Sequence, residues 1–376
     1  MRKIIFSIAF LTILPFCLPA DLYGQELHQD LQGFWRAEVL RIVSEKDTTI
    51  PGTQTPVLIQ EVEARILEGE RESETIILEN DFQPLKPGDK FFVNYLVTID
   101  GQEIFSVKDI DRRGVLFFFT ILFGLTILIF GGWQGFRALI GLFGTFLVII
   151  YVLLPLLLKG YPPVLTSTLI ATAVLFLAIY FTHGFNRESS VAFIGTVIAV
   201  CLTSVLAFIA VKTSKLTGFA SDEAVFLNFA TFGELNLSGL VLGGIIVGVL
   251  GVLDDIAITQ SAVVSELYRS APHLSKREVY KKALRVGREH AGALVNTLAL
   301  AYAGAALPLL LLFSASQVSF LMVINQEALA TEILRTIVGS IGLILTIPIT
   351  TLLAVFALEK YKGKEPKVVR HGHSHV

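Results

Sequence analysis

The pattern of hydrophobic and polar positions changes near residue 113. Between residues 34 and 110, five short runs alternate apolar and polar residues, and breaks rich in Pro, Gly and Asp separate them. After residue 113, seven apolar runs have the length and character of membrane-spanning helices, the first being the shortest. They cover residues 115–130, 138–158, 164–181, 190–211, 237–264, 291–313 and 333–358. The pattern predicts a mainly α protein, a polytopic helical membrane bundle of about seven transmembrane helices that follows a small β domain.

The five alternating runs predict five strands. The runs read FWRAEVLRIV, VLIQEVEARIL, ETIILEN, KFFVNYLVTI and EIFSVKDI, and they are rich in β-branched and aromatic residues. Five short strands with turns between them favour a small barrel of the OB-like type. OB-like barrels also bind nucleic acid, but residues 21–113 carry ten Lys and Arg against nineteen Asp and Glu. This acidic balance argues against a nucleic-acid partner.

The two ends of the chain differ from the rest. Residues 1–20 combine Arg2 and Lys3, an apolar run and Leu18-Pro19-Ala20, which is typical of a secretory signal. We expect its removal, and an uncleaved anchor is the alternative. The expected domains are this signal peptide, an exported domain at 21–113, a helical transmembrane domain at 114–358 and a basic tail at 359–376. The tail ends in alternating imidazoles at His371, His373 and His375, which are weak metal-ligand candidates because a flexible tail lacks preorganisation.

Composition and charge indicate a membrane protein with a defined orientation. Of the 376 residues, 53% are hydrophobic and only 16% are charged. With the β domain outside, an odd number of spans places the C-terminus in the cytoplasm. The loops then inside hold fourteen Lys and Arg, and the loops outside hold four. This bias satisfies the positive-inside rule and predicts the cytoplasmic (plasma) membrane as the location.

Two adjacent carboxylates, Asp254 and Asp255, interrupt the apolar, glycine-rich run at 237–264. A carboxylate in hydrocarbon costs roughly 2.5–3.5 kcal/mol, so such residues usually serve a function. The pair is therefore the leading candidate for a transport or ion-binding site. The alternative is that it lies near the inner head groups and only anchors the helix. A helical wheel turns Asp254 about 100° away from Asp255. The Asp255 stripe also contains Gly244, Gly248, Gly251 and Thr259.

The run at 291–313 repeats this arrangement of small residues. Gly292 and Asn296 share a face, and Pro308 weakens the helix next to it. Small residues let helices approach closely, so we expect these two spans to pack along their small faces. Asn296 and Thr259 would then line a polar site with the two aspartates. The alternative is that the polar residues only join neighbouring helices.

Several other polar positions have simpler interpretations. Ser275 and Glu278 predict a capping box that opens a basic helix. Its cations either fix the topology and contact anionic lipid or bind a specific partner. Ser221 predicts the start of a short helix lying in the interface, and His183 is interpreted as an ordinary helix-end residue.

An enzyme is not expected. An intramembrane aspartyl protease needs carboxylates on two separate helices, whereas Asp254 and Asp255 are neighbours on one helix. The sequence contains no Walker phosphate loop, HExxH or GxSxG motif. We therefore assign no catalytic residue, metal or cofactor.

A β domain followed by spans and by GVLDDIAITQSAVVSEL resembles the YibE/F-like family of bacterial multi-pass membrane proteins. The segments GFWRAEVLRIV, PGDKFFV and GGWQGFRALI also carry the resemblance. It implies a permease-like protein of the bacterial cytoplasmic membrane, specifies no substrate and does not reach the His tail.

Together these observations predict a secondary transporter or channel-like permease whose Asp pair binds a proton or cation. The alternative is a non-transporting membrane scaffold or sensor whose exported domain binds a partner or envelope component. The expected partners are the lipid bilayer, a proton, cation or small solute, and either further copies of the chain or an envelope component.

Overall fold

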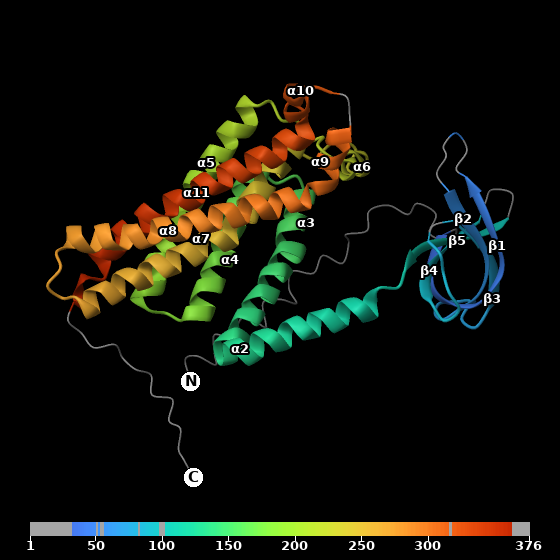
Figure 1. Ribbon diagram of the computed structural model, residues 1–376, viewed down its shortest axis with the longest axis horizontal. Helices are drawn as coiled ribbons and strands as arrows, with labels where there is room; N and C mark the ends of the chain where they lie inside the picture. The colour runs from blue at the N-terminus through green and yellow to red at the C-terminus, as the bar shows by residue number, and fades with distance from the viewer. Residues whose placement is uncertain are drawn as a thin grey trace, which may run out of the picture. The chain divides into compact units, whose positions relative to one another are not determined.

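The computed structural model describes residues 32–362, apart from 50–51, 53–55, 82, 98–101 and 316–317. The expected signal segment and the histidines of the tail lie outside the described residues. The chain divides into two compact units, Met1–Thr126 and Ile127–Val376. Figure 1 shows their strands and helices, and each unit is described by itself.

The first unit contains the five predicted strands, which form one antiparallel sheet in the order β3-β2-β1-β4-β5. The strands are β1 (Gln32–Thr49), β2 (Pro56–Ile66), β3 (Thr75–Asn80), β4 (Lys90–Val97) and β5 (Glu103–Ile110). The alternating sequence pattern therefore located all five.

The long strand β1 organises this sheet. Its first residues pair with β4 and the remainder pairs with β2. Two register shifts, at Val39/Arg41 and Ile42/Ser44, bend the strand. The edge strands β3 and β5 come into contact, so the sheet curls around its buried face. That face holds an apolar core that includes Val62, Phe91 and Val93.

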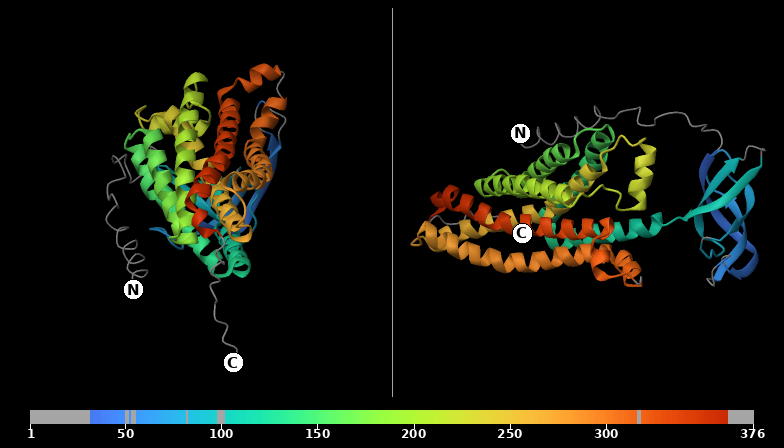
Figure 2. Two further views of the ribbon diagram at one scale, coloured as in Figure 1. Left: turned by 90° about the vertical axis from the view of Figure 1, so that its left-hand side faces the viewer. Right: turned by 90° about the horizontal axis from the view of Figure 1, so that it is seen from above.

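The second unit is helical, as predicted. Helix α2 begins in the first unit and continues into the second. The helices are α2 (Arg113–Val148), η3 (Ile149–Leu153), α3 (Leu154–Leu158), α4 (Pro163–His183), α5 (Arg187–Thr213), α6 (Asp222–Ala230), α7 (Leu237–Ser270), α8 (Lys276–Ala305), α9 (Leu307–Ala315), α10 (Phe320–Ile324), α11 (Glu327–Ala357) and η4 (Glu359–Tyr361). Within this unit, α7, α8 and α11 run side by side (Figures 1 and 2).

Within the described residues, five helical stretches are long and apolar enough to cross a membrane. Helices α8 and α9, which are bent by 63°, make a sixth if they form one span. The sequence pattern predicts seven. The difference lies in the first stretch, Arg113–Leu158, which the pattern divides into two spans.

That first stretch is not one continuous helix. At a helical rise of 1.5 Å, its 46 residues would extend for roughly 70 Å, more than twice a hydrocarbon core of about 30 Å. Gly132 interrupts it with φ 51° and ψ −135°, a conformation that side-chain-bearing residues avoid. Near the break, Gly135 lies so close to the Ile127 carbonyl that a Cβ at position 135 would clash with it.

Helix α7 occupies the centre of the helical unit and packs against α4, α5, α8 and α11. Its buried face includes Leu253, Ile256 and Ala257. Helices α5 and α11 approach closely because Gly195 faces Thr350 and Gly342 faces Thr203, with no space for a Cβ at either glycine.

The predicted helix starts are confirmed. Ser221 caps α6 by accepting a hydrogen bond from the Ala224 amide, and Ser275 and Glu278 form the capping box of α8. The weakening expected near Pro308 corresponds to the end of α8 at Ala305.

Candidate functional site

Ionisable side chains of two other helices lie within electrostatic range of Asp255. Asp254 is half-buried and Asp255 is exposed to the surroundings of the helices. The Asp255 carboxylate lies within electrostatic range of the imidazoles of His183, at the end of α4, and His290, on α8. Ionisable groups on α4 and α8 are therefore electrostatically linked to the Asp255 carboxylate on α7.

A fourth helix adds a cation. Arg137 of α2 donates a hydrogen bond to the carbonyl of Phe181, and its guanidinium carbon lies 5.6 Å from the Phe181 ring centroid. The same guanidinium is within electrostatic range of His183. We call Arg137, His183, Asp254, Asp255 and His290 the inner cluster.

Local sequence explains why these side chains are available. Leu253, Ile256 and Ala257 are fully buried and fix the rotation of α7, so that the two aspartates lie outside its most buried face. Gly184, with φ 79°, ends α4 directly after His183. Asn186 then starts α5 by accepting a hydrogen bond of 2.8 Å from the Ser189 amide.

This arrangement is suited to proton exchange. Imidazole is the side chain whose ordinary titration falls near neutral pH, and a carboxylate beside it can accept or return the proton. Two carboxylates that interact strongly titrate as a pair. In the part of the chain that the structure describes, no group of three or more His, Cys, Asp or Glu side chains is arranged to hold a metal ion.

The other predicted site residues lie at different places. Thr259 is half-buried, one helical turn beyond Asp255 on α7. Asn296 is exposed on α8, six residues beyond His290. At about 100° per residue, the two side chains point about 120° apart around the helix axis. On α8, it is His290 that the structure brings within electrostatic range of Asp255.

The four predicted packing glycines also have distinct surroundings. A Cβ added at Gly248 would lie 2.6 Å from the Tyr302 hydroxyl, and one at Gly244 would lie 3.8 Å from Arg335 Nη2. At Gly251 and Gly292 an added Cβ would meet nothing within 4 Å. Of the four predicted packing glycines, only Gly248 therefore lies in a close approach between helices.

Gly244 and Gly248 face a second set of polar side chains, which the sequence analysis does not identify as a site. Arg335 Nη1 donates to Glu332 Oε1 at 2.6 Å, and the Arg335 guanidinium lies 5.9 Å from the Tyr302 ring centroid. The Tyr302 hydroxyl and Arg335 Nε are buried, with no hydrogen-bond partner among the described residues. We call Tyr302, Glu332 and Arg335 the outer cluster. The sequence feature that could have indicated this cluster is the spacing of Glu332 and Arg335, which lie one helical turn apart beside an apolar run.

Buried and half-buried polar side chains also join α7 to its neighbours. Gln260 and Thr351 share a hydrogen bond of 2.9 Å between α7 and α11. Glu188 of α5 accepts hydrogen bonds from Ser265 at 2.6 Å and from Arg269 at 2.8 Å. These contacts join α7 to α11 through Gln260 and to α5 through Glu188.

Taken together, the apolar helices, the central α7 with its two carboxylates and the antiparallel N-terminal sheet define a polytopic, membrane-type helical protein. A sequence model described as YibE/F-like protein matches residues 119–360, and the chain belongs to this family. The match covers both clusters. Searches of curated proteins and of solved structures returned no match.

Proposed function

We propose that this protein is a secondary transporter or channel-like permease that moves a proton, or a solute coupled to a proton. The observation that carries this proposal is that Asp255 lies within electrostatic range of His183 and His290, which belong to two other helices. Ionisable groups among membrane helices are costly, and where they occur they commonly form proton relays or line a path for ions.

The location of the two clusters on α7 supports the same proposal. The inner cluster lies around Asp255, and the outer cluster faces Gly244 and Gly248. Eleven residues of helix from Gly244 to Asp255 correspond to about 16 Å along the axis. The two clusters lie beside α7 at two depths and would provide successive binding positions for a proton or a polar solute.

The topology that we propose has seven spans, with the break at Gly132 separating the first two and the bent α8–α9 pair counted as one. The β domain is then exported, the C-terminus is cytoplasmic, and the protein resides in the bacterial cytoplasmic membrane. The excess of Lys and Arg in the loops that this topology places inside supports it. The central position of β1 and the contact between β3 and β5 support an OB-like barrel. We propose no enzymatic activity.

Proton flux in liposomes tests this proposal. Purified full-length protein is reconstituted with an internal pH-sensitive dye, and a potassium gradient with valinomycin sets the membrane potential. We expect proton movement by the wild type and a loss of at least about tenfold in Asp255→Asn, since proton-transfer groups commonly contribute 10²–10⁴-fold.

Glu266→Gln is the matched control. Glu266 is an exposed carboxylate on the same helix, eleven residues beyond Asp255, and we expect its variant to keep wild-type flux. Equal flux in Asp255→Asn, Asp254→Asn and the wild type would contradict a role for the pair.

A scaffold or sensor is the second candidate, and the β unit provides the observation that favours it. Trp35 lies 5.0 Å from Tyr95, and Tyr95 lies 5.3 Å from Phe105, measured between ring centroids. Arg71 stacks over Tyr95 at 4.8 Å. Partly exposed aromatic rings with an arginine are typical of protein-binding surfaces. Capture of an envelope component that Tyr95→Ala abolishes, together with no flux of protons or solutes, would favour this candidate.

A further inference from the structure

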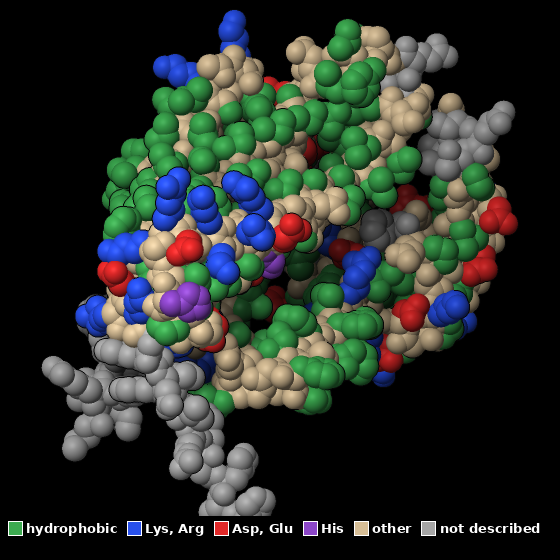
Figure 3. All heavy atoms as spheres, turned by 60° about the vertical axis from the view of Figure 1, so that its left-hand side comes forward, with side chains coloured by type: hydrophobic (Ala, Val, Ile, Leu, Met, Phe, Trp, Pro, Cys, Tyr) green, Lys and Arg blue, Asp and Glu red, His purple; other side chains and the backbone are tan. Residues whose placement is uncertain are grey.

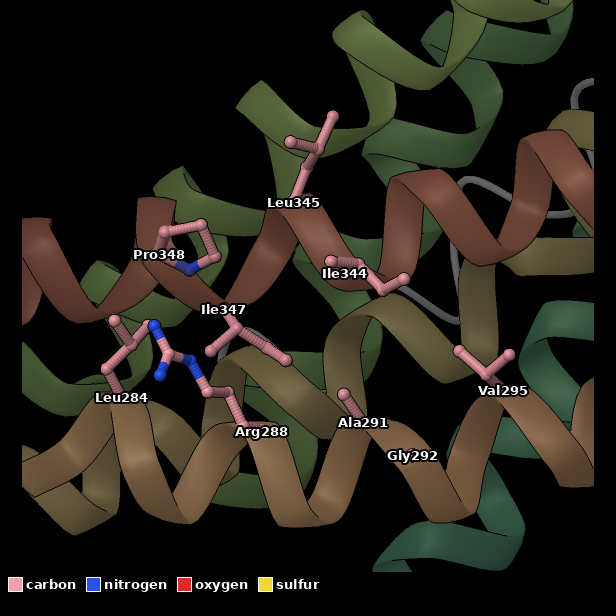
Figure 4. A pocket seen from close by; sticks show the side chains of 9 residues that line it. All are labelled: Leu284, Arg288, Ala291, Gly292, Val295, Ile344, Leu345, Ile347 and Pro348. Carbon is pink, nitrogen blue, oxygen red and sulfur yellow. The ribbon is translucent and has the colours of Figure 1, made fainter.

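An apolar groove lies between α8 and α11, and its lining includes neither aspartate. Its volume is about 520 Å³, and of its nine lining residues only Arg288 is charged. In Figure 4 the Arg288 side chain extends from α8 toward Pro348 of α11, and Ala291 and Gly292 form the floor beside it. The groove is open on one side, so a molecule in the surrounding medium can enter it laterally.

The sequence explains the groove. Ala291 and Gly292 present almost no side chain, and nothing lies within 4 Å of a Cβ added at Gly292. On the opposite wall, Pro348 interrupts the interior of α11 and supplies no N–H to the Ile344 carbonyl one turn earlier. Two small residues facing a proline therefore leave an apolar space between these helices.

The groove crosses the boundary between the charged and the apolar parts of α8. Residues 276–290 contain six Lys and Arg and two Glu, whereas residues 291–305 contain no charged residue. Leu284 and Arg288 belong to the charged part, and Gly292 and Val295 belong to the apolar part. A charge boundary of this kind marks the depth at which lipid head groups meet acyl chains.

Most of the cations on the charged part of α8 form no close ion pair with the described part of the protein. Lys276 pairs with Glu359 at 2.8 Å. Among the described residues, Lys281, Lys282, Arg285 and Arg288 take part in no ion pair and are all exposed. Figure 3 shows Lys and Arg side chains gathered over this end of the helical unit.

We propose that the groove binds one anionic phospholipid. An acyl chain lies against Ala291, Gly292 and Pro348, and the phosphate accepts hydrogen bonds from the Arg288 guanidinium. Arginine suits this role because its planar donors match phosphate oxygens and because its aliphatic stem packs along apolar surface. A zwitterionic lipid fits the apolar wall equally well but gains less from the surrounding cations. Charge complementarity therefore selects the anionic head group.

Native mass spectrometry of the delipidated full-length protein tests the proposal. Phosphatidylglycerol and phosphatidylcholine with identical acyl chains are added separately, and the first bound lipid is quantified. We expect phosphatidylglycerol to be retained about fivefold more strongly, and Arg288→Gln to remove about that factor, as expected for one cation near the head group. Arg277→Gln removes a cation from the same helix that does not line the groove, and we expect it to retain wild-type preference.

A second variant separates the apolar wall from the charge. Gly292→Leu fills the groove at a position where added atoms meet nothing, so it should fold and yet lose the first bound molecule of both lipids. Circular dichroism and size-exclusion profiles like those of the wild type verify folding. Equal retention of the two lipids by the wild type would overturn the proposal, as would equal losses in Arg288→Gln and Arg277→Gln. Crosslinking between copies through Gly292→Cys, with no lipid retained, would assign the groove to a second copy instead.

Discussion

At the residue scale, the helical unit depends on glycines that have no space for a side chain. Gly342 of α11 lies against Thr203 of α5, whereas Gly251 of α7 faces open space. We predict that Gly342→Ala lowers the free energy of unfolding by about 1–3 kcal/mol, the usual cost of overpacking. Gly251→Ala should leave it unchanged or raise it, because alanine favours helix. Thermal unfolding in detergent measures both variants, and equal melting temperatures would contradict the close approach.

A second residue-scale prediction concerns Asp111, which lies just before α2 and outside the spans. Hydrogen bonds from the Arg113 guanidinium lower the pKa of Asp111 to about 2, from an ordinary value of 3.8. Because its folded-state pKa lies below its unfolded value, Asp111 stabilises the folded protein above about pH 4. This contribution is lost as the pH falls from about 4 to about 2.

Trp35 provides the measurement of this effect. The chain has two tryptophans, so Trp133→Phe leaves Trp35, which packs beside Tyr95, as the only one. We expect the melting temperature followed by Trp35 fluorescence to fall between pH 4 and pH 2, and to fall less steeply when Asp111→Asn is added. The same slope with and without Asp111→Asn would contradict the assignment.

The sequence could identify only part of the inner cluster. Asp254 and Asp255 stand out because carboxylates are rare in an apolar run, and their local spacing predicts their separation on the helix. His183 and His290 lie 72 and 35 residues from Asp255 along the chain. His183 stands at an ordinary helix end and His290 at the end of a basic segment, so neither stands out as a site residue. Only the packing of α4 and α8 around α7 brings them near the carboxylate. The same packing brings His290 of α8 within electrostatic range of Asp255.

At the element scale, the break at Gly132 determines how the first apolar stretch is divided. A side chain at φ 51° and ψ −135° costs about 1–3 kcal/mol. We therefore predict that Gly132→Ala lowers the free energy of unfolding by that amount. Gly144→Ala is the control, because Gly144 has ordinary helical geometry and an open Cβ direction. Equal unfolding curves for the two variants would show that the break is not required.

Elements with a clear period could be predicted closely, and breaks within elements could not. The alternation in FWRAEVLRIV located β1, although the strand extends further at both ends because its two halves pair with different partners. The apolar run at 237–264 located α7, which continues to Ser270 because Ser265 and Arg269 bond to Glu188. In the first stretch, hydropathy shows that two spans separate near residues 130–138. It does not predict the non-helical backbone at Gly132.

At the scale of the whole molecule, the proposed topology puts the loop after α3 and the loop after α7 on opposite sides of the membrane. Lys159→Cys and His273→Cys, each in a Cys17→Ser/Cys201→Ser background, report these loops. We expect a membrane-impermeant maleimide added to intact cells to label position 159, and to reach position 273 only after permeabilisation. Labelling of both positions from outside would contradict the seven-span arrangement.

The account as a whole depends on proton exchange at Asp254 and Asp255. The most direct measurement is an infrared pH titration of the purified protein in lipid, which detects the carbonyl stretch of protonated carboxylic acids. We predict a reversible band that persists in Glu266→Gln and disappears in the double variant Asp254→Asn/Asp255→Asn. An unchanged band in the double variant, or no titrating band in the wild type, would contradict the central claim.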